Sequence, residues 1–128
     1  SDGEDKPSSK EIHVDFMDTP HAKIGMFVKL IQNNIVFNSK LKKFFDKVDK
    51  EFDEEGTKQS SEYSVFNRAW YYIKDINIDT ESHLYAAIKQ DTKYLLDSLK
   101  LAIEYFENTE EYERCAHLYK IEQTVKTF

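Results

Sequence analysis

Apolar side chains recur every three or four residues along most of the chain, the spacing of one face of an α-helix. Thr19 and Pro20 stand before the first such stripe and suit an N-cap and a first helical position. The stripe skips a turn at Asn38-Ser39, where Ser39 can cap a new helix. We predict one long helix over about 20–52, with a break at Asn38-Ser39 as the alternative. The stripe contains Ile24, Phe27, Val28, Ile31, Ile35, Leu41, Phe44, Phe45, Val48 and Phe52.

The pattern stops at residues 53–61, DEEGTKQSS, which predict a loop with Gly56 as a left-handed helix C-cap. A second helix is predicted over about 62–76, followed by a short connection at 77–80. The apolar face of this second helix contains Tyr63, Phe66, Trp70 and Ile73.

A near-heptad stripe predicts a third helix over about 81–107. Asn108 and Glu111 have the spacing of a capping box, which predicts a fourth helix over about 110–126. The third stripe consists of Leu84, Ile88, Leu95, Leu99, Ala102 and Phe106. On the fourth helix we expect the buried residues to be Tyr112, Cys115 or Ala116, Tyr119 and Val125.

Short connections after the second and third helices favour antiparallel neighbours. The sequence therefore predicts an all-α protein, an antiparallel helical bundle of about four helices. Only 3 Gly and 2 Pro occur, which argues against the many turns of an all-β fold. The polar, acidic residues 1–12 are predicted to be a disordered N-terminal tail, and residues 13–128 a single helical domain.

Charge is distributed unevenly along the chain. The formal net charge is −6, which disfavours general affinity for nucleic acid or anionic membrane. Residues 20–50 nevertheless hold seven lysines against Asp46 and Asp49. A solvated helix face, a contact with an acidic protein surface and a nucleic-acid contact all fit this basic row, although no arginine accompanies it. The row is Lys40, Lys43, Lys47 and Lys50, spaced three, four and three residues apart.

Aromatic residues supply a second candidate surface. Trp70, Tyr71 and Tyr72 cannot all face one core, because consecutive residues of a helix point about 100° apart. Exposed tyrosines are enriched at protein interfaces, so we predict Tyr71 and Tyr72 as protein-binding residues, together with Lys43. Phe16, in the stretch Val14-Asp15-Phe16-Met17, is a further candidate, either as a docking motif or folded back beside the first helix.

Residues that carry chemistry are sparse. Glu113 and His117 stand one helical turn apart, as two metal ligands can, but no further ligand accompanies them. Cys115 lies about 200° around the helix from His117, so the two do not form a nucleophile and base. We therefore expect no enzyme, no cofactor and no metal, with Glu113 and His117 as an ordinary surface pair and Cys115 in the core.

One short segment resembles a known motif. Residues 99–121 are similar to the helical hairpin of UVR-type motifs in bacterial excision-repair proteins, through Ala102, Tyr112-Glu113 and Cys115-Ala116. They depart from it at Tyr119-Lys120, where the motif prefers an Arg-Asp pair. The resemblance covers under a fifth of the chain and implies a role in protein contacts.

These observations predict a non-catalytic helical protein-interaction module: a regulator, adaptor or assembly factor. The alternative is a nucleic-acid-associated accessory protein that uses the basic row. Long amphipathic helices often complete their core against a second copy, so both a monomer and a homodimer fit the pattern. A single cysteine suits the cytoplasm, and we expect no membrane association. Richness in Lys, Asn, Ile, Tyr and Phe is typical of AT-rich genomes, such as those of phages and low-GC bacteria.

Overall fold

The computed structural model describes residues 17–48 and 53–128, and every regular element in these ranges is an α-helix. The all-α prediction is confirmed, but the described ranges contain five helices rather than about four. They are α2 (Pro20–Lys47), α3 (Glu54–Ile73), α4 (Glu81–Ile88), α5 (Thr92–Asn108) and α6 (Tyr112–Thr127). Residues 1–12 and Phe16 lie outside the described ranges.

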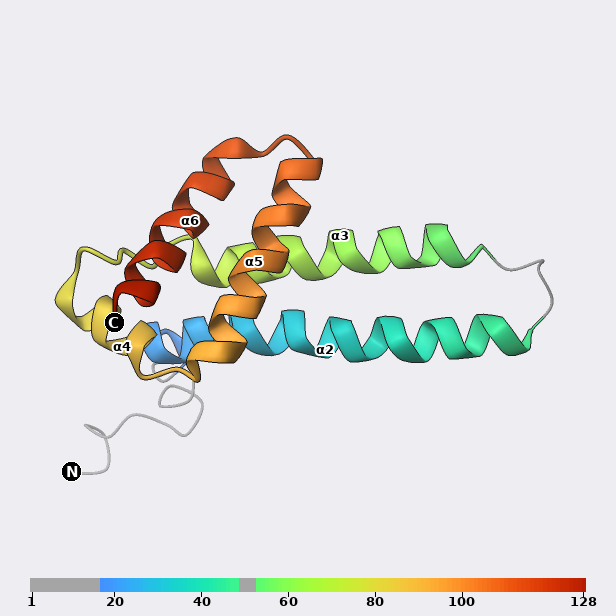
Figure 1. Ribbon diagram of the computed structural model, residues 1–128, viewed down its shortest axis with the longest axis horizontal. Helices are drawn as coiled ribbons and strands as arrows, with labels where there is room; N and C mark the ends of the chain where they lie inside the picture. The colour runs from blue at the N-terminus through green and yellow to red at the C-terminus, as the bar shows by residue number, and fades with distance from the viewer. Residues whose placement is uncertain (1–16, 49–52) are drawn as a thin grey trace, which may run out of the picture.

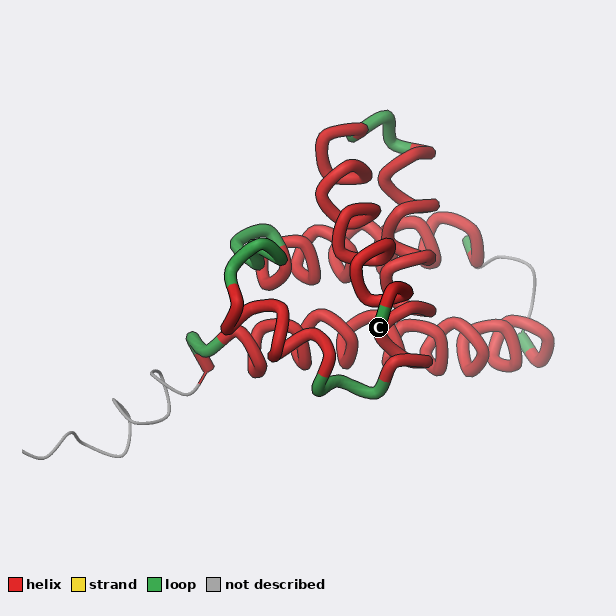
Figure 2. Tube along the Cα trace, turned by 60° about the vertical axis from the view of Figure 1, so that its left-hand side comes forward, coloured by secondary structure: helices red, strands yellow, loops and turns green. Residues whose placement is uncertain are grey.

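Two helical hairpins form the fold (Figure 1). The longer one consists of α2 and α3, which run antiparallel and contact each other extensively. The shorter one, α5 and α6, crosses the same side of α2 and α3 near the end where the chain enters α2, and short α4 lies at that end. Figure 2 shows the same two hairpins after a turn about the vertical axis.

Helix α2 is continuous through Asn38-Ser39, as predicted. The Thr19 hydroxyl accepts a hydrogen bond from the Ala22 amide at 3.2 Å, which confirms Thr19 as the N-cap. Ser39 does not cap a new helix, since it lies inside α2, and the Asn38 side-chain amide donates to Asn34 Oδ1 one turn back, at 3.3 Å. The predicted end at about Phe52 is wrong, because α2 ends at Lys47 and Val48 is already extended; Phe52 itself lies outside the described residues.

The predicted loop at 53–61 is wrong, since α3 begins at Glu54. Asp53 is its N-cap: Oδ1 accepts from the Gly56 amide at 2.8 Å. Acidic Glu54 and Glu55 follow in the first turn, where the helix dipole favours negative charge. Gly56 is therefore helical and has no positive φ. Apolar periodicity failed here because these turns are largely exposed and need no apolar stripe.

The predicted third helix is two helices. It breaks at residues 89–91, where Asp91 starts α5 by accepting a hydrogen bond from the Tyr94 amide at 3.1 Å. Gln90 in the break donates to the carbonyl oxygen of His21 at 3.1 Å, which ties it to α2. The apolar stripe continued across the break in the sequence, so spacing alone gave one helix.

The last helix lies within two residues of its predicted position, but the predicted capping box is wrong. Asn108 is the last residue of α5, and Glu111 is the N-cap of α6 without a side-chain cap bond. Glu110 turns the chain with φ of 60°, a left-handed conformation. Val125 is buried as predicted, but Tyr112 and Tyr119, which were expected to be buried, are 63% and 56% exposed, and Leu118 and Ile121 are buried instead.

The core lies where the two hairpins cross. Phe66 stacks on Tyr105 with ring centroids 4.5 Å apart, joining α3 to α5. On α2 the last fully buried apolar side chain is Ile31, and beyond Asn34 no side chain of α2 is buried. Both helices of the long hairpin thus continue past the core. The largest fully buried side chains include Phe27, Phe106, Ile24, Ile31, Ile73, Leu95 and Leu99.

Candidate protein-interaction surface

The outer part of the long hairpin projects beyond α5 and α6 (Figure 1). We call residues 35–48 and 53–65 the arm; the first range belongs to α2 and its C-cap, the second to α3 and its N-cap. No buried apolar side chain occurs in the arm. Several large apolar side chains are instead exposed on its α2 part. They are Ile35, Val36, Phe37 and Phe44, at 44%, 53%, 44% and 51%.

One row of these residues points away from the core. Phe37 and Phe44 alternate with Lys40 and Lys47 at spacings of three, four and three residues, which places all four on one face of α2. Phe37 comes six residues after buried Ile31, so it points about 120° away from the core direction. All four side chains are exposed. We call this side of the long hairpin, opposite α5 and α6, the back face.

Helix α3 adds its own residues to the back face. Phe66, Ala69 and Ile73 of α3 are buried on the core side. Arg68 follows Phe66 by two residues and so points about 200° around the helix from it. Ser64 and Arg68 are exposed, and Tyr71, three residues after Arg68, is 63% exposed.

Tyr71 is held by its neighbours on the back face. The Lys74 ammonium lies 5.0 Å from its ring centroid, and the Tyr72 ring meets it edge-on at 5.6 Å. Tyr72 itself is half-buried against the core. Of the two tyrosines predicted to bind protein, Tyr71 therefore offers most of its surface and Tyr72 supports it.

The two sides of the arm carry opposite charge. Residues 35–48, the basic leg, hold four lysines and one aspartate, a net charge of +3. Residues 53–65, the acidic leg, hold four carboxylates and one lysine, a net charge of −3. Lys40, Lys43 and Lys47 are all exposed, as are Glu54 and Glu55. The arm therefore has positive charge and exposed apolar side chains on its α2 part and negative charge on its α3 part.

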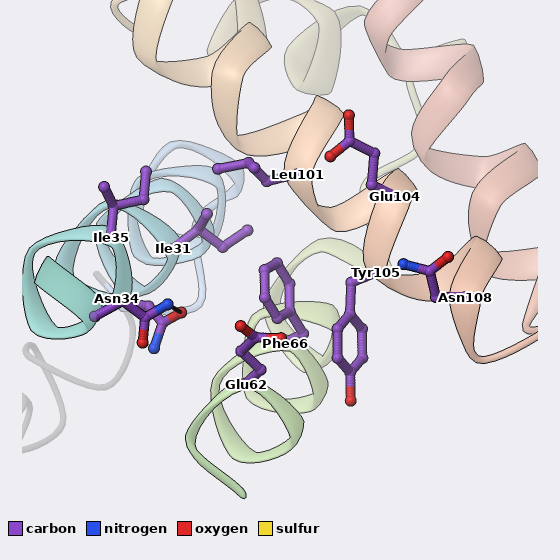
Figure 3. A pocket seen from close by; sticks show the side chains of 10 residues that line it. Ile31, Asn34, Ile35, Glu62, Phe66, Leu101, Glu104, Tyr105 and Asn108 are labelled. Atoms are coloured by element: carbon purple, nitrogen blue, oxygen red, sulfur yellow. Dashed lines mark hydrogen bonds between the residues drawn. The ribbon is translucent and has the colours of Figure 1, made fainter. Parts of the chain in front are cut away.

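A small cleft lies on the opposite side, at the root of the arm (Figure 3). Its volume is about 210 Å³. The carboxylate of Glu62 lies beside Phe66, whereas Glu104 points away from it (Figure 3). Burial, and next the charges of Glu111 and Glu62, raise the pKa of the Tyr105 phenol, which stays protonated at neutral pH. The cleft brings no nucleophile and base together. It is lined by Ile31, Asn34, Ile35, Asn38, Glu62, Phe66, Leu101, Glu104, Tyr105 and Asn108.

The Glu113–His117 pair does not come together as ligands. His117 Nε2 lies 2.9 Å from the Ile73 carbonyl oxygen, and its ring meets Trp70 edge-on at 5.3 Å, so it links α6 to α3. Glu113 is exposed. Within residues 17–48 and 53–128, no group of three His, Cys, Asp or Glu side chains is arranged to hold a metal ion.

Cys115 lies between the helices of the short hairpin. Its thiol donates to the Ile103 carbonyl oxygen at 3.6 Å. Burial raises the pKa of the thiol, as does the charge of Glu107, so the thiolate is disfavoured. The geometry places Cys115 in a packing role.

Sequence reasoning identified only part of this surface. Lys40, Lys43, Lys47 and Tyr71 lie on or beside the back face, while Lys50 and Phe16 are outside the described residues. It assigned Phe44 to the core and gave Phe37 no role. The sequence contains a signal for this surface, because Phe37 and Phe44 alternate with Lys40 and Lys47 on one face of the helix. A helix face that packs into a core does not carry lysines at alternate positions.

Each helix within residues 17–48 and 53–128 is too short or too polar to span a lipid bilayer. No protein-family model matches the chain, and no curated protein or solved structure is significantly similar to it. The likeness of residues 99–121 to the UVR-type hairpin therefore rests on the residues quoted for it.

Proposed function

We propose that the chain is a non-catalytic helical protein-interaction module, a regulator, adaptor or assembly factor, and that the back face is its contact surface. The observation that carries this proposal is the arm: a long amphipathic hairpin continues past its own core and exposes Val36, Phe37 and Phe44. Clustered exposed apolar side chains within a charged rim are typical of protein contact sites.

The physical reason is the free energy of burial. A Phe side chain that goes from exposed to buried contributes about 1.5–3 kcal/mol. Phe37 and Phe44 gain only about half of their burial from the chain itself, at 44% and 51% exposed. A partner that covers them recovers the remainder, while Lys40 and Lys47 stay at the edge and select for acidic neighbours.

Site-specific photocrosslinking tests this proposal. The photoreactive residue p-benzoylphenylalanine replaces Phe37 in one variant and Tyr71 in a second, and the protein is irradiated in cells of the source organism. A discrete covalent adduct is expected from both positions. A variant at Tyr94, which is 50% exposed on α5 away from the back face, is the matched control.

The Tyr94 variant should give no adduct, or a different one. If neither Phe37 nor Tyr71 forms an adduct above the Tyr94 background, the back face is not a contact surface and the proposal fails. Circular dichroism of each variant shows whether it has folded.

A nucleic-acid accessory role is the second candidate, favoured by one observation. Aromatic and basic side chains alternate along the back face, and single-stranded nucleic acid is bound by stacking bases on aromatics between lysines that meet phosphates. A fluorescent single-stranded oligonucleotide measures this directly. Binding should weaken steeply with added salt, and Lys43→Glu with Lys47→Glu should abolish it. Binding that does not depend on salt, or none at low salt, excludes this candidate.

A further inference from the structure

We infer that the partner of the back face is a second copy of this chain, and that two arms pack back to back as a four-helix bundle. This inference rests on the proposed function, because it names what the same surface binds. The geometry that points to it is the juxtaposition, within one arm, of an exposed apolar row with two legs of opposite charge.

The charges make the arm complementary to itself. The basic leg carries +3 and the acidic leg −3. Glu55 and Glu62 lie on the side of α3 that carries Phe66. The carboxylates toward the back face are therefore those of Asp53 and Glu54, which match Lys40, Lys43 and Lys47 of a copy. A surface with both signs side by side matches its own copy after rotation by half a turn, which is the requirement of a two-fold symmetric interface. A chain with only basic charge on its arm repels its copy.

The charges also select one of two symmetric arrangements. With the two-fold axis across the arm, α2 lies over α2 of the copy and the basic legs face each other. With the axis along the arm, α2 lies over α3 of the copy, and each basic leg faces an acidic one. Like charges directly opposed destabilise an interface, so the second arrangement is favoured. Both arms then point the same way.

Small side chains on α3 suit this arrangement. Thr57, Ser60 and Ser64 lie on the outer side of α3 and are exposed. Small residues let a facing helix approach closely, so the phenylalanines of one copy can lie between the small side chains of the other. Phe37 lies level with Lys58 across the hairpin, given that Asn34 is bonded to Ser61 by its side chain at 3.0 Å.

The available area is sufficient for a dimer. The back of α2 from Met26 to Lys47 is about 33 Å long, and two adjacent helices are about 20 Å wide. The face therefore covers about 650 Å² per copy, or about 1,300 Å² in total, within the range of specific protein interfaces. The face includes the arm and extends inward to Tyr71.

Sedimentation velocity of the full chain, over a range of micromolar concentrations, tests the inference. A concentration-dependent dimer is expected. Phe37→Ser should raise the dimer dissociation constant at least about tenfold, because it removes an apolar contact near the centre of the interface. Tyr94→Ser, an exposed aromatic on α5, should leave the constant unchanged.

Charge reversal tests the arrangement of the two legs. Lys40→Glu with Lys43→Glu makes both legs acidic, and Glu54→Lys with Thr57→Lys makes the back of both legs basic. Each variant alone should be monomeric at concentrations where the natural chain is a dimer, and an equimolar mixture of the two should form a heterodimer. Circular dichroism confirms that all of these surface variants are folded.

The orientation has its own readout. A spin label on Glu55→Cys, in a Cys115→Ser background, lies near the outer end of each arm and on the side of α3 away from the back face. Two labels should be close together if both arms point the same way and far apart if they point oppositely.

Each outcome supports or overturns the inference. A dimer that dissociates on Phe37→Ser, with labels close together, supports it. A chain that stays monomeric, a dimer unaffected by Phe37→Ser, or labels far apart overturns it. Crosslinking at Phe37 separates this failure from that of the proposed function: an adduct with a different protein retains the interaction module and excludes self-association. Without any adduct, both fail.

Discussion

At the scale of single residues, two asparagines one turn apart on α2 should contribute to stability to different extents. Asn34 is 6% exposed, donates to Ser61 Oγ at 3.0 Å and accepts from Asn38 at 3.3 Å. Asn38 Oδ1 is buried and has no hydrogen-bond partner among the described residues. Asn34→Ala should lower the free energy of unfolding by about 1–3 kcal/mol, because it leaves buried polar groups unpaired.

Asn38→Leu should cost less, within about 1 kcal/mol, since the loss of its bond to Asn34 Oδ1 is offset by removal of a buried acceptor that already lacks a partner. Urea denaturation at one fixed protein concentration measures both changes. Asn33→Ala, on the exposed side of the same turn, is the control. A larger loss for Asn38→Leu than for Asn34→Ala would show that the hydrogen-bond assignment is wrong.

The single thiol gives a pH prediction. Burial, followed by the charge of Glu107, raises the pKa of Cys115 above its usual range. The thiolate is the reactive form, so alkylation by iodoacetamide should rise with pH about a midpoint above that of the chain unfolded in urea. Because the raised pKa belongs to the folded state, this thiol favours folding less as pH rises past the unfolded value. A midpoint equal in both states would contradict it.

At the scale of elements, the start of α3 shows where residue type outweighs periodicity. A Cβ on Gly56 would lie 2.2 Å from Asp53 Oδ2, so Gly56→Ala must displace the capping side chain. Ala is favoured over Gly in a helix by about 1 kcal/mol, and loss of a cap costs about 0.5–2 kcal/mol. The two effects oppose, and Gly56→Ala alone should be neutral or destabilising.

The same change should stabilise the protein once the cap is gone. In an Asp53→Ala background, Gly56→Ala should gain about 1 kcal/mol, because no carboxylate opposes the new methyl group. A double-mutant cycle from thermal unfolding measures the coupling. An equal effect of Gly56→Ala in both backgrounds would mean that Asp53 does not cap α3.

The elements also show what the sequence could establish. The long, continuous α2 and its Thr19 cap followed from periodicity and cap chemistry, because both act over neighbouring residues. The break before α5 did not, because Gln90 is held there by His21, which lies in a different helix. The predicted capping box before α6 failed for another reason, the conformation of the connection. Glu110 takes a left-handed turn with φ of 60°, which its residue type does not favour.

At the scale of the whole molecule, the sequence predicted helical class but not the layout of two crossing hairpins. The periodicity of apolar residues predicts which face of a helix is buried. It does not predict which other helix packs against that face. Phe44 fits the stripe of α2 and was expected in the core, yet α5 crosses α2 nearer its start. An apolar stripe longer than the core it serves leaves exposed residues, and the back face consists of those.

This mismatch predicts that the arm is less stable than the body. The arm of α3 lacks buried apolar side chains, whereas Ala69 and Ile73 of the same helix are fully buried. Local opening costs less where few apolar contacts are lost. Amide hydrogens at 58–65 should therefore exchange faster with deuterium than those at 69–73, as measured by mass spectrometry of peptides, although one continuous helix contains both.

Varying the protein concentration distinguishes the intrinsic stability of the arm from protection of its amide hydrogens by a second copy. If two arms pack together, exchange at 58–65 should slow as protein concentration rises through the dissociation constant, while exchange at 69–73 stays unchanged. The Phe37→Ser variant should lose this dependence and keep the difference between arm and body. An arm as protected as the body at every concentration, in the variant as well, would mean that the contacts within one hairpin suffice, so the exposed row would need no partner.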